Sequence, residues 1–448
     1  MSGPSGAVDP AVSGRAVSGP DGPRAAVTVI GEAIIDLVPG RQPRTFHAVP
    51  GGSPYNVAIG LARLGHQTSL MARLADNAFG RLLREHAGAE GIDLTAAPHA
   101  FEPSTLAVVS LDATAQASYD FYMDGTADWQ WTAEETGRAP EGTAVLHFGS
   151  LASWTPPGDV RIGELADQMR TRGDVLISYD PNVRPGLLGD HGHGQRMIER
   201  AIPLAHLVKA STDDIAWLYP DRTPDQVAQH WLGLGATVVV ITASAEGADA
   251  FTAHGLSVHR PARDIRVVDT VGAGDSFTAG LIGSLIRRNR TAPTALAGCS
   301  ADHLAGALDD AILVAALNCQ RRGNDPPTLA DVAAALEHPP PLRSPSARLA
   351  PAPRGRTGHW RRARTGHRRR ALTAPAHGAA RTNGASSWRR LMARALAQTY
   401  PAPPASSVSS SRQWSCHVEY LQGLTMPRFC VANGKDHSCT VTTRGLLS

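Results

Sequence analysis

Short apolar runs alternate with amphipathic stretches along residues 27–337. Five of these runs are nearly unbroken, as is typical of strands buried on both faces of a sheet. They lie at residues 27–31, 143–148, 175–179, 207–210 and 238–242. Because stretches with helical periodicity separate them, for instance 158–172 and 224–234, the pattern predicts an α/β fold with a mainly parallel sheet.

Two segments, 33–50 and 104–123, depart from this rhythm. Both have the pattern of extended hairpins, with no helix between their apolar runs. We therefore expect a small β-structure that projects from the main sheet and acts as a lid over a site.

The two ends of the chain differ in composition from its body. Residues 1–25 are rich in Gly, Pro, Ser and Ala and lack the apolar core of a signal peptide, which predicts a disordered leader. Residues 341–448 contain 18 Lys and Arg but only two acids, whereas residues 1–340 carry a net charge of about −13. We expect one folded domain over 26–338 and a basic, disordered tail over 339–448. Nucleic acid is expected to bind only through this tail, if at all.

Cysteine spacing and hydropathy exclude several classes of protein. The five cysteines form no Cys-x-x-Cys pair, so neither a zinc site nor a disulfide framework is predicted. No apolar run reaches the roughly 18 residues of a membrane span. We expect a cytoplasmic protein with no membrane partner.

The strongest local motif is a glycine-rich turn, DTVGAGDSFTAG, at residues 269–280. Gly272, Ala273 and Gly274 precede a long helical pattern, and the free N–H groups at a helix start bind anions such as phosphate. Asp275 follows them directly. Its carboxylate either accepts a proton from an attacking hydroxyl or caps the helix, and the motif alone leaves both open. It is not a Walker A loop, because no Gly-Lys-Ser/Thr follows.

Two motifs together resemble the signatures of the PfkB/ribokinase family of carbohydrate kinases. The turn at 269–280 is similar to the second family signature, and residues 51–58 (GGSPYNVA), running on to Gly65, are similar to the first. The resemblance covers residues 27–337. It implies a ribokinase-like three-layer sandwich with a mainly parallel central sheet and a small β lid, and ATP-dependent phosphorylation of a sugar hydroxyl.

The resemblance also implies a catalytic set and a sugar-binding set. Asp275 is the implied base, and the other implied catalytic residues are Gly272, Ala273, Gly274 and Arg184. The implied sugar-binding residues are Asp36, Gly51, Gly52, Asn56, Phe121, Arg184 and Asp275.

Local chemistry leaves simpler alternatives for several of these residues. Asn56 could be a capping residue, Asp36 a surface acid on a lid strand, and Arg184 a surface arginine fixed by two prolines. Ser53 and Pro54 are themselves predicted as the N-cap and first residue of a helix.

For the nucleotide half, the resemblance implies binding of ATP with Mg²⁺ at two strand ends and at the glycine turn. The implied residues are Lys209, Ser211, Asp214, Thr242, Ser244, Gly247, Gly272 and Gly274. Asp214 would bind Mg²⁺ through water. Asp269 and the carbonyl of Val271 match a monovalent-cation site, for which K⁺ is the candidate. Ser244 stands where the family has glycine.

Local details favour a fructokinase. The segments that begin at Gly31, Phe121 and His147 are fructokinase-like, although Met123 stands where many fructokinase-like relatives have Arg. The other candidate substrates are 2-keto-3-deoxygluconate, ribose and aminoimidazole riboside. A non-catalytic sugar or nucleotide sensor on the same scaffold is the competing class. The resemblance further implies a homodimer formed through the lid strands.

Overall fold

A computed structural model of the chain describes residues 26–40, 42, 44–111 and 117–343. The predicted leader at 1–25 and nearly all of the predicted tail, from 344 onward, lie outside the described residues.

The central sheet of the described part has eight strands in the order β14-β13-β12-β11-β10-β9-β1-β4. Their bounds are β1 (Ala26–Ile30), β4 (Thr68–Met71), β9 (Thr143–Gly149), β10 (Leu176–Asp180), β11 (Leu207–Ser211), β12 (Val238–Thr242), β13 (Ala248–Thr252) and β14 (Ser257–Arg260). Strands β12 to β4 pair in parallel, whereas β13 and β14 are added antiparallel at one edge. The five apolar runs of the sequence are β1, β9, β10, β11 and β12, so the predicted α/β fold with a mainly parallel sheet is confirmed.

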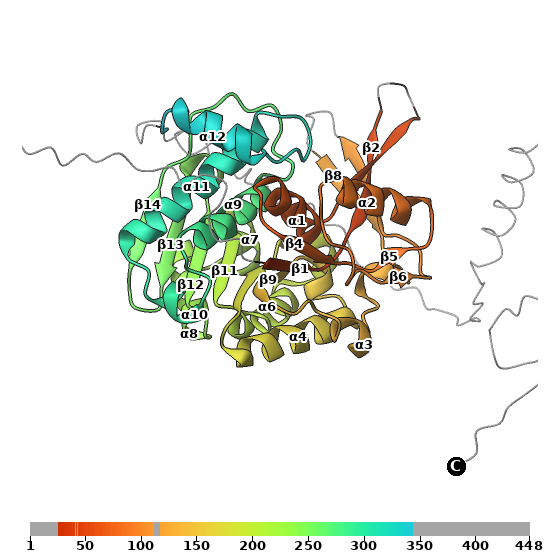
Figure 1. The fold of residues 1–448 in the computed structure, drawn as a ribbon, viewed down its shortest axis with the longest axis horizontal. Coiled ribbons are helices and arrows are strands. Elements are labelled where there is room, and N and C mark those ends of the chain that lie inside the picture. The colour runs from red at the N-terminus through yellow and green to blue at the C-terminus, as the bar shows by residue number, and fades with distance from the viewer. Residues whose placement is uncertain (1–25, 41, 43, 112–116, 344–448) are drawn as a thin grey trace, which may run out of the picture. The chain divides into compact units, whose positions relative to one another are not determined.

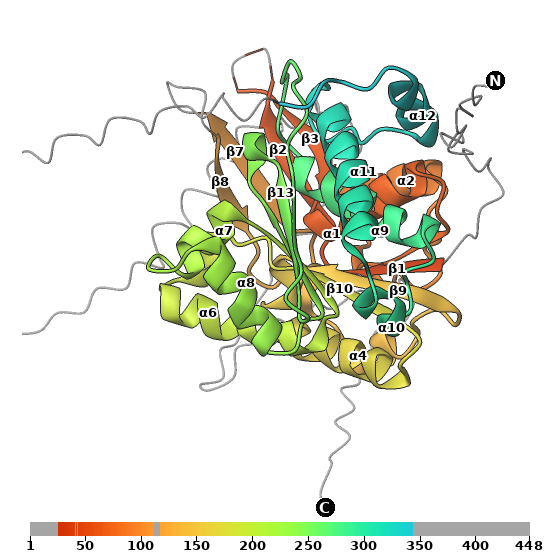
Figure 2. The ribbon, with the colours of Figure 1, turned by 90° about the vertical axis from the view of Figure 1, so that its left-hand side faces the viewer.

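Helices cover both faces of this sheet and make it the middle of three layers (Figures 1 and 2). One face packs against α1 (Ser53–Arg63), α9 (Ala273–Arg287) and α11 (Ala301–Cys319), and the other against α4 (Gly158–Arg172), α7 (Thr212–Leu218) and α8 (Pro224–Gly233). Side chains alternate between these two cores along each strand: Val29 belongs to the first and Ile30 to the second. Within the described ranges, no helix is long and apolar enough to cross a membrane.

Shorter elements complete the described body. The helices are α2 (Ala78–Ala89), α3 (Ala133–Thr136), α5 (Pro185–Leu188), α6 (His191–Glu199), α10 (Pro293–Ala297) and α12 (Leu329–Glu337). The 3-10 turns are η1 (Ala127–Trp129), η2 (Leu151–Ser153), η3 (Ile202–Leu204) and η4 (Ser244–Glu246), and β5 (Leu74–Ala75) pairs with β6 (His99–Ala100).

A separate four-stranded sheet, the lid sheet, stands beside α1 and α2 (Figure 1). It contains β2 (Ile34–Pro39), β3 (Phe46–Gly51), β7 (Leu106–Leu111) and β8 (Ala117–Tyr122), in the order β3-β2-β7-β8. The two segments that broke the helical rhythm of the sequence thus form two antiparallel hairpins, which join through a parallel β2–β7 pairing.

The described body continues past the predicted boundary at residue 338. The backbone N–H of Asp264 donates to the carbonyl of Pro341 at 2.8 Å, and that of Arg343 donates to the carbonyl of Ala262 at 2.8 Å. Leu342 forms an antiparallel bridge with Arg263. The first residues of the predicted tail therefore pair with the body.

Candidate active site

The glycine-rich turn forms the start of α9, at the carboxyl ends of the parallel strands. Gly272 is the N-cap and has a φ of 73°, a conformation that favours glycine. A Cβ atom at this position would also overlap the side-chain oxygen of Asn324. No side chain caps this helix. The Ala273 N–H donates to the Thr270 carbonyl at 3.2 Å, and the next N–H groups, of Gly274 and Asp275, have no intrahelical acceptor. Such an end binds an anion.

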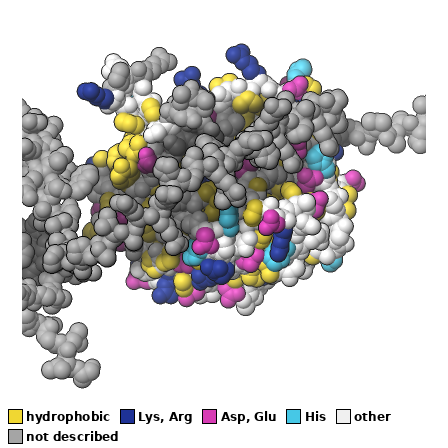
Figure 3. All heavy atoms as spheres, turned by 180° about the vertical axis from the view of Figure 1, so that it is seen from behind, with side chains coloured by type: hydrophobic (Ala, Val, Ile, Leu, Met, Phe, Trp, Pro, Cys, Tyr) yellow, Lys and Arg dark blue, Asp and Glu magenta, His cyan; other side chains and the backbone are white. Residues whose placement is uncertain are grey.

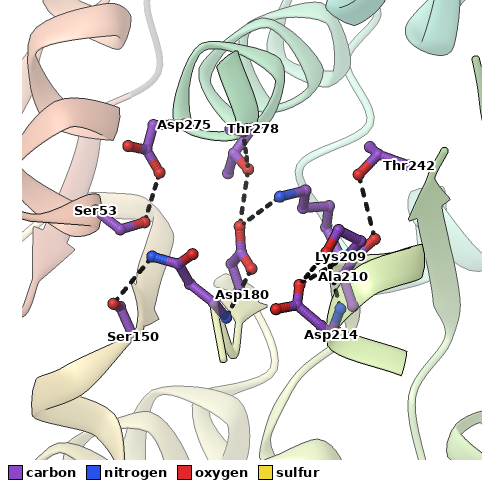
Figure 4. A network of polar contacts seen from close by, with 12 residues as sticks. Ser53, Ser150, Asp180, Lys209, Ala210, Asp214, Thr242, Asp275 and Thr278 are labelled. Atoms are coloured by element: carbon purple, nitrogen blue, oxygen red, sulfur yellow. Dashed lines mark hydrogen bonds and ion pairs between the residues drawn. The ribbon is translucent and has the colours of Figure 1, made fainter. Parts of the chain in front are cut away.

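Asp275 lies in the first turn of α9 and is held by side chains of α1 (Figure 4). Its Oδ1 accepts a hydrogen bond from Ser53 Oγ at 2.6 Å, and its Oδ2 accepts one from Asn56 Nδ2 at 2.8 Å. Burial raises the pKa of Asp275, although the bonds from Ser53 and Asn56 oppose the shift. The carboxylate therefore interacts with a different helix from its own, and its higher pKa makes it a stronger proton acceptor.

The predicted cap at Ser53 is wrong. Ser53 is already helical, the N-cap is Gly52, and no side-chain capping bond is made at this end of α1. Gly52 has a φ of 103°, and a Cβ there would lie 2.7 Å from the carbonyl oxygen of Glu32. The chain enters α1 through a conformation that glycine alone adopts easily, which frees the Ser53 hydroxyl for Asp275.

Asn324 is a site residue that sequence reasoning missed. Its Nδ2 donates to Asn56 Oδ1 at 2.8 Å, which fixes the orientation of the Asn56 amide so that Nδ2 faces Asp275. The two asparagines are separated by 268 positions, and no motif marked the second one. Among the described residues, the buried Oδ1 of Asn324 has no hydrogen-bond partner.

Asp36 and Arg184 approach the same place from the lid sheet and the main sheet. Asp36 lies on β2 against Gly51, where a Cβ would be 2.5 Å from Asp36 Oδ2. Burial raises the pKa of Asp36 to about 6; Arg184 lowers it and Asp275 raises it. These opposing influences place all three charges in one neighbourhood, as the sequence predicted.

The aromatic strand β8 supplies the predicted Phe121. Phe121 stacks on Tyr119 with ring centroids 6.2 Å apart, and it packs with Met123 against the second core. Burial raises the pKa of Tyr119; Asp36 raises it further and Arg184 lowers it. Strand β8 is therefore within electrostatic reach of the sugar-side charges.

A buried ion pair lies beneath the glycine turn (Figure 4). Lys209 Nζ is 2.9 Å from Asp180 Oδ2, and a Cβ on Gly274 would lie 3.2 Å from the same ammonium. Burial lowers the pKa of Lys209, but the carboxylates of Asp180 and Asp214 outweigh this and leave the pKa raised. Lys209 therefore places a stable positive charge next to the anion-binding turn.

Ser211 and Asp214 form a capping box at the start of α7. Asp214 Oδ2 accepts from the Ser211 N–H at 2.8 Å and from its hydroxyl at 2.7 Å, while Oδ1 accepts from the Val183 N–H at 2.9 Å. Because protein donors occupy most of this carboxylate, it fits an outer, water-mediated contact with a cation better than a direct bond.

The turn after β12 keeps a glycine-like backbone despite its serine. Ser244 has a φ of 48° and Gly247 a φ of 109°. Thr242, at the end of the strand, donates through Oγ1 to the carbonyl of Ala210 at 3.4 Å. The structure thus brings Thr242, Ser244 and Gly247 into one turn beside β11.

The predicted monovalent-cation residues also contact each other. Asp269 accepts hydrogen bonds from the N–H groups of Val271 and Gly323, at 3.1 and 2.9 Å. The Val271 carbonyl accepts one from Asn318 Nδ2 at 2.8 Å. No group of three or more His, Cys, Asp or Glu that could hold a metal ion occurs in the part of the chain that the structure describes.

The mainly parallel sheet with a lid, and the half-buried carboxylate beside an anion-binding helix start, are features that the resemblance to the PfkB/ribokinase family implied. Residues 24–330 match the pfkB family of carbohydrate kinases. The chain therefore belongs to this family, and the predicted fold and ATP-dependent sugar kinase activity are confirmed.

The individual relatives include fructokinases and an aminoimidazole riboside kinase. A fructokinase from Rhizobium leguminosarum bv. trifolii is 37% identical over 258 residues, which cover 57% of this chain and 78% of the relative. An aminoimidazole riboside kinase from Salmonella typhimurium is 32% identical over 265 residues, covering 59% of this chain and 82% of the relative. The structure of a fructokinase from Vibrio cholerae O395 in a fructose-, ADP- and potassium-bound form aligns with a TM-score of 0.61 at 25% identity, over 71% of this chain and 99% of that one.

Proposed function

We propose that the protein phosphorylates fructose with ATP and that Asp275 is the general base. The observation that carries the proposal is the position of the Asp275 carboxylate, half-buried at the anion-binding start of α9 and oriented by Ser53 and Asn56. The similarity to fructokinases supports fructose as the acceptor.

In this mechanism the acceptor hydroxyl gives its proton to Asp275 while its oxygen attacks the γ-phosphorus. The bond from that phosphorus to the bridging oxygen breaks, and ADP leaves with the electron pair. The N–H groups of the turn Gly272, Ala273 and Gly274, together with Arg184, stabilise the negative charge spread over the transferred group. Closure of the lid sheet excludes water, which limits wasteful hydrolysis.

The sugar lies between the lid sheet and the start of α1. Asp36 and Asn56 offer acceptors and donors to its hydroxyls, and Arg184 offers donors. Gly51 and Gly52 allow close approach of the backbone. The ring of Phe121 covers the bound sugar from β8.

The nucleotide occupies the other half, along Lys209, Ser211, Thr242, Ser244 and Gly247. When bound, Mg²⁺ supplies charge neutralisation at the phosphates, and Asp214 would hold it through water. Asp269 and the Val271 carbonyl are the candidates for K⁺.

An ADP-release assay across a panel of sugars tests the proposal. We expect fructose to give the highest kcat/KM, ahead of 2-keto-3-deoxygluconate and ribose. The main competitor is aminoimidazole riboside, which the identity to the Salmonella kinase favours. A higher kcat/KM with this riboside would reassign the substrate but not the reaction. A failure of every sugar in the panel to release ADP would support the non-catalytic sensor alternative.

Exposed apolar side chains on the lid sheet favour a homodimer. The strand registers place Val38, Val49 and Tyr119 on the face that Asp36 shares, and Phe46 and Tyr122 on the opposite face, with exposed fractions between 36% and 63%. Figure 3 shows hydrophobic side chains gathered on the side where the lid lies. A second copy pairing through these strands would cover the face that bears Phe46 and Tyr122, and light scattering should give twice the chain mass. Replacing Phe46 with Lys should then yield monomers. We place the protein in the cytoplasm, where ATP is available.

A further inference from the structure

Three sequence motifs meet beneath the proposed sugar half of the site. They are Gly31-Glu32 after β1, the segment 147–150 at the end of β9, and the segment 180–184 after β10. The mechanism above uses one residue of these motifs, Arg184. The others include Glu32 and Ser150, which are only 1% and 2% exposed. Burying a carboxylate is costly, so its hydrogen-bond partners need an explanation.

Glu32 interacts with the segment that follows β9. Its Oε2 accepts the N–H of Ala152 at 3.1 Å, and the Ser150 hydroxyl is near enough to the carboxylate to lower its pKa. Ser150 Oγ accepts a hydrogen bond from Asn182 Nδ2 at 3.1 Å, which leaves the hydroxyl proton to face Glu32.

The next contact reaches the arginine. Asn182 Oδ1 accepts from Arg184 Nη1 at 2.8 Å, and the carbonyls of Asn182 and Val183 accept from the same nitrogen at 3.4 and 3.1 Å. All the hydrogen bonds that the described residues make to Arg184 use Nη1, which leaves Nε and Nη2 for a ligand.

The donor and acceptor of each hydrogen bond fix the orientation of the Asn182 side-chain amide. If the amide were flipped, its oxygen would face a serine lone pair, and its NH₂ group would face the guanidinium. Both contacts would be repulsive, so the acceptor Glu32 at one end of the relay determines which group faces Arg184 at the other.

The backbone adds an independent observation. Ser150 and Asn182 have φ values of 54° and 39°, a region that residues other than glycine rarely adopt. Two such residues bonded to each other indicate that the fold maintains an unfavourable conformation here, as occurs at functional sites.

We propose that Glu32, Ser150 and Asn182 form a relay, buried at Glu32 and Ser150, that positions the guanidinium of Arg184 for the sugar and the transferred phosphoryl group. The relay rests on the proposed function, because it acts by positioning Arg184, whose role is part of that function. Glu32 is a positioning residue, since it acts through two other side chains.

Kinetics of full-length variants with fructose and ATP test the relay. Glu32→Gln keeps the size of the side chain but replaces one acceptor with a donor, and Ser150→Ala removes the middle link. We expect each to lower kcat/KM for fructose about tenfold, the usual lower range for residues that orient a functional group. The KM for ATP should change less than about twofold, since the relay does not reach the nucleotide half.

The decisive comparison is a double-mutant cycle with Arg184→Ala. If Glu32 acts through Arg184, Glu32→Gln should cause less than about a twofold further loss in the Arg184→Ala background. Asp128→Asn is the matched control, because Asp128 is another buried acid at the lid base but binds Ala33 N and Thr105 Oγ1 instead. The fold-loss in kcat/KM that Asp128→Asn causes should therefore be the same in the wild-type and Arg184→Ala backgrounds.

Failure of the relay and failure of the proposed function give different results. A full additional loss from Glu32→Gln in the Arg184→Ala background, or wild-type constants for Glu32→Gln alone, would overturn the relay. An inactive wild type, or an Arg184→Ala variant with full activity, would instead overturn the proposed function. In that case a crystal structure of Glu32→Gln decides: a displaced Arg184 side chain supports the relay, and unchanged Asn182 and Arg184 side chains refute it.

Discussion

The two halves that we propose for the active site, one for the sugar and one for the nucleotide, are held together by different parts of the chain. In the sugar half, side chains from distant segments bind one another: Ser53 and Asn56 contact Asp275, and Asn324 contacts Asn56. In the nucleotide half, the turn after β12 depends on backbone conformation, with positive φ at Ser244 and Gly247. Activity should therefore depend most on the chemical identity of the side chains in the sugar half. In the nucleotide half it should depend most on which backbone conformations a residue can adopt.

The largest effect should come from the centre of the side-chain network. Asp275→Asn keeps the shape of the residue but removes the proton acceptor, so kcat should fall roughly 10²–10⁴-fold, the usual contribution of a general base. The KM for ATP should change little. Steady-state kinetics with fructose would measure both values.

Asp213→Asn is the control for this change, because it removes an exposed acid from the first turn of α7. It should leave kcat close to the wild-type value. Wild-type turnover in Asp275→Asn would show that the acid is structural.

The sugar half also carries a stability cost that depends on pH. Burial raises the pKa of Glu32 from 4.5 to about 7, although hydrogen bonds from Ser150 and Ala152 oppose the shift. Between these two values the folded state binds the proton more strongly than the unfolded state. Stability from this group is therefore greatest at low pH and is lost as pH rises through about 7.

Urea unfolding of the wild type and Glu32→Gln between pH 4.5 and 8 measures this cost. The variant cannot titrate at this position, so its stability relative to the wild type should increase with pH, by up to about 3 kcal/mol. Asp128, whose burial raises its pKa to about 6, titrates in both proteins, and its charge also raises the pKa of Glu32. The same pair of proteins in an Asp128→Asn background therefore isolates the contribution of Glu32. A difference that stays flat with pH would contradict the assignment.

A smaller effect is expected one contact away from the base. Asn324→Ala frees the Asn56 amide to rotate, and kcat/KM for fructose should fall about tenfold, which corresponds to the roughly 1.4 kcal/mol of one good hydrogen bond. Asn324→Asp keeps the size of the side chain but cannot donate to Asn56 Oδ1, so it should lose at least as much. If Asn324→Asp were fully active, the contact would be packing alone.

Sequence patterns located the backbone of the site but not all of its side-chain contacts. The glycines at 272 and 274 and the unbroken apolar strands are local signals, because each depends on neighbours within a few positions. They were sufficient to predict the helix α9 and the parallel sheet, whereas the role of Asp275 as a base stays a proposal. The roles of Ser53 and Asn324 depend on contacts across 222 and 268 positions, which no local pattern encodes.

Ser53 shows why local rules also mislead. A serine before a proline at a helix start has the pattern of an N-cap, but Gly52 enters the helix with positive φ and takes that place. The same limit applies to Glu32: its motif was visible, whereas its bond to Ser150 required two strand ends to come together.

The smallest effect should come from the nucleotide half, where Ser244 replaces the family glycine. If the turn contributes only its backbone conformation, Ser244→Gly should leave the KM for ATP within about twofold. It should change the free energy of unfolding by less than about 1 kcal/mol. Glycine relieves the backbone strain at a φ of 48°, but its greater freedom in the unfolded chain offsets this gain. Ser244→Val, whose β-branched side chain tolerates positive φ poorly, should raise the KM for ATP several-fold. If the serine hydroxyl itself bound the nucleotide, both variants would be impaired to a similar degree. Measuring the KM for ATP of the two side by side therefore distinguishes a turn built by the backbone from one built by a side chain.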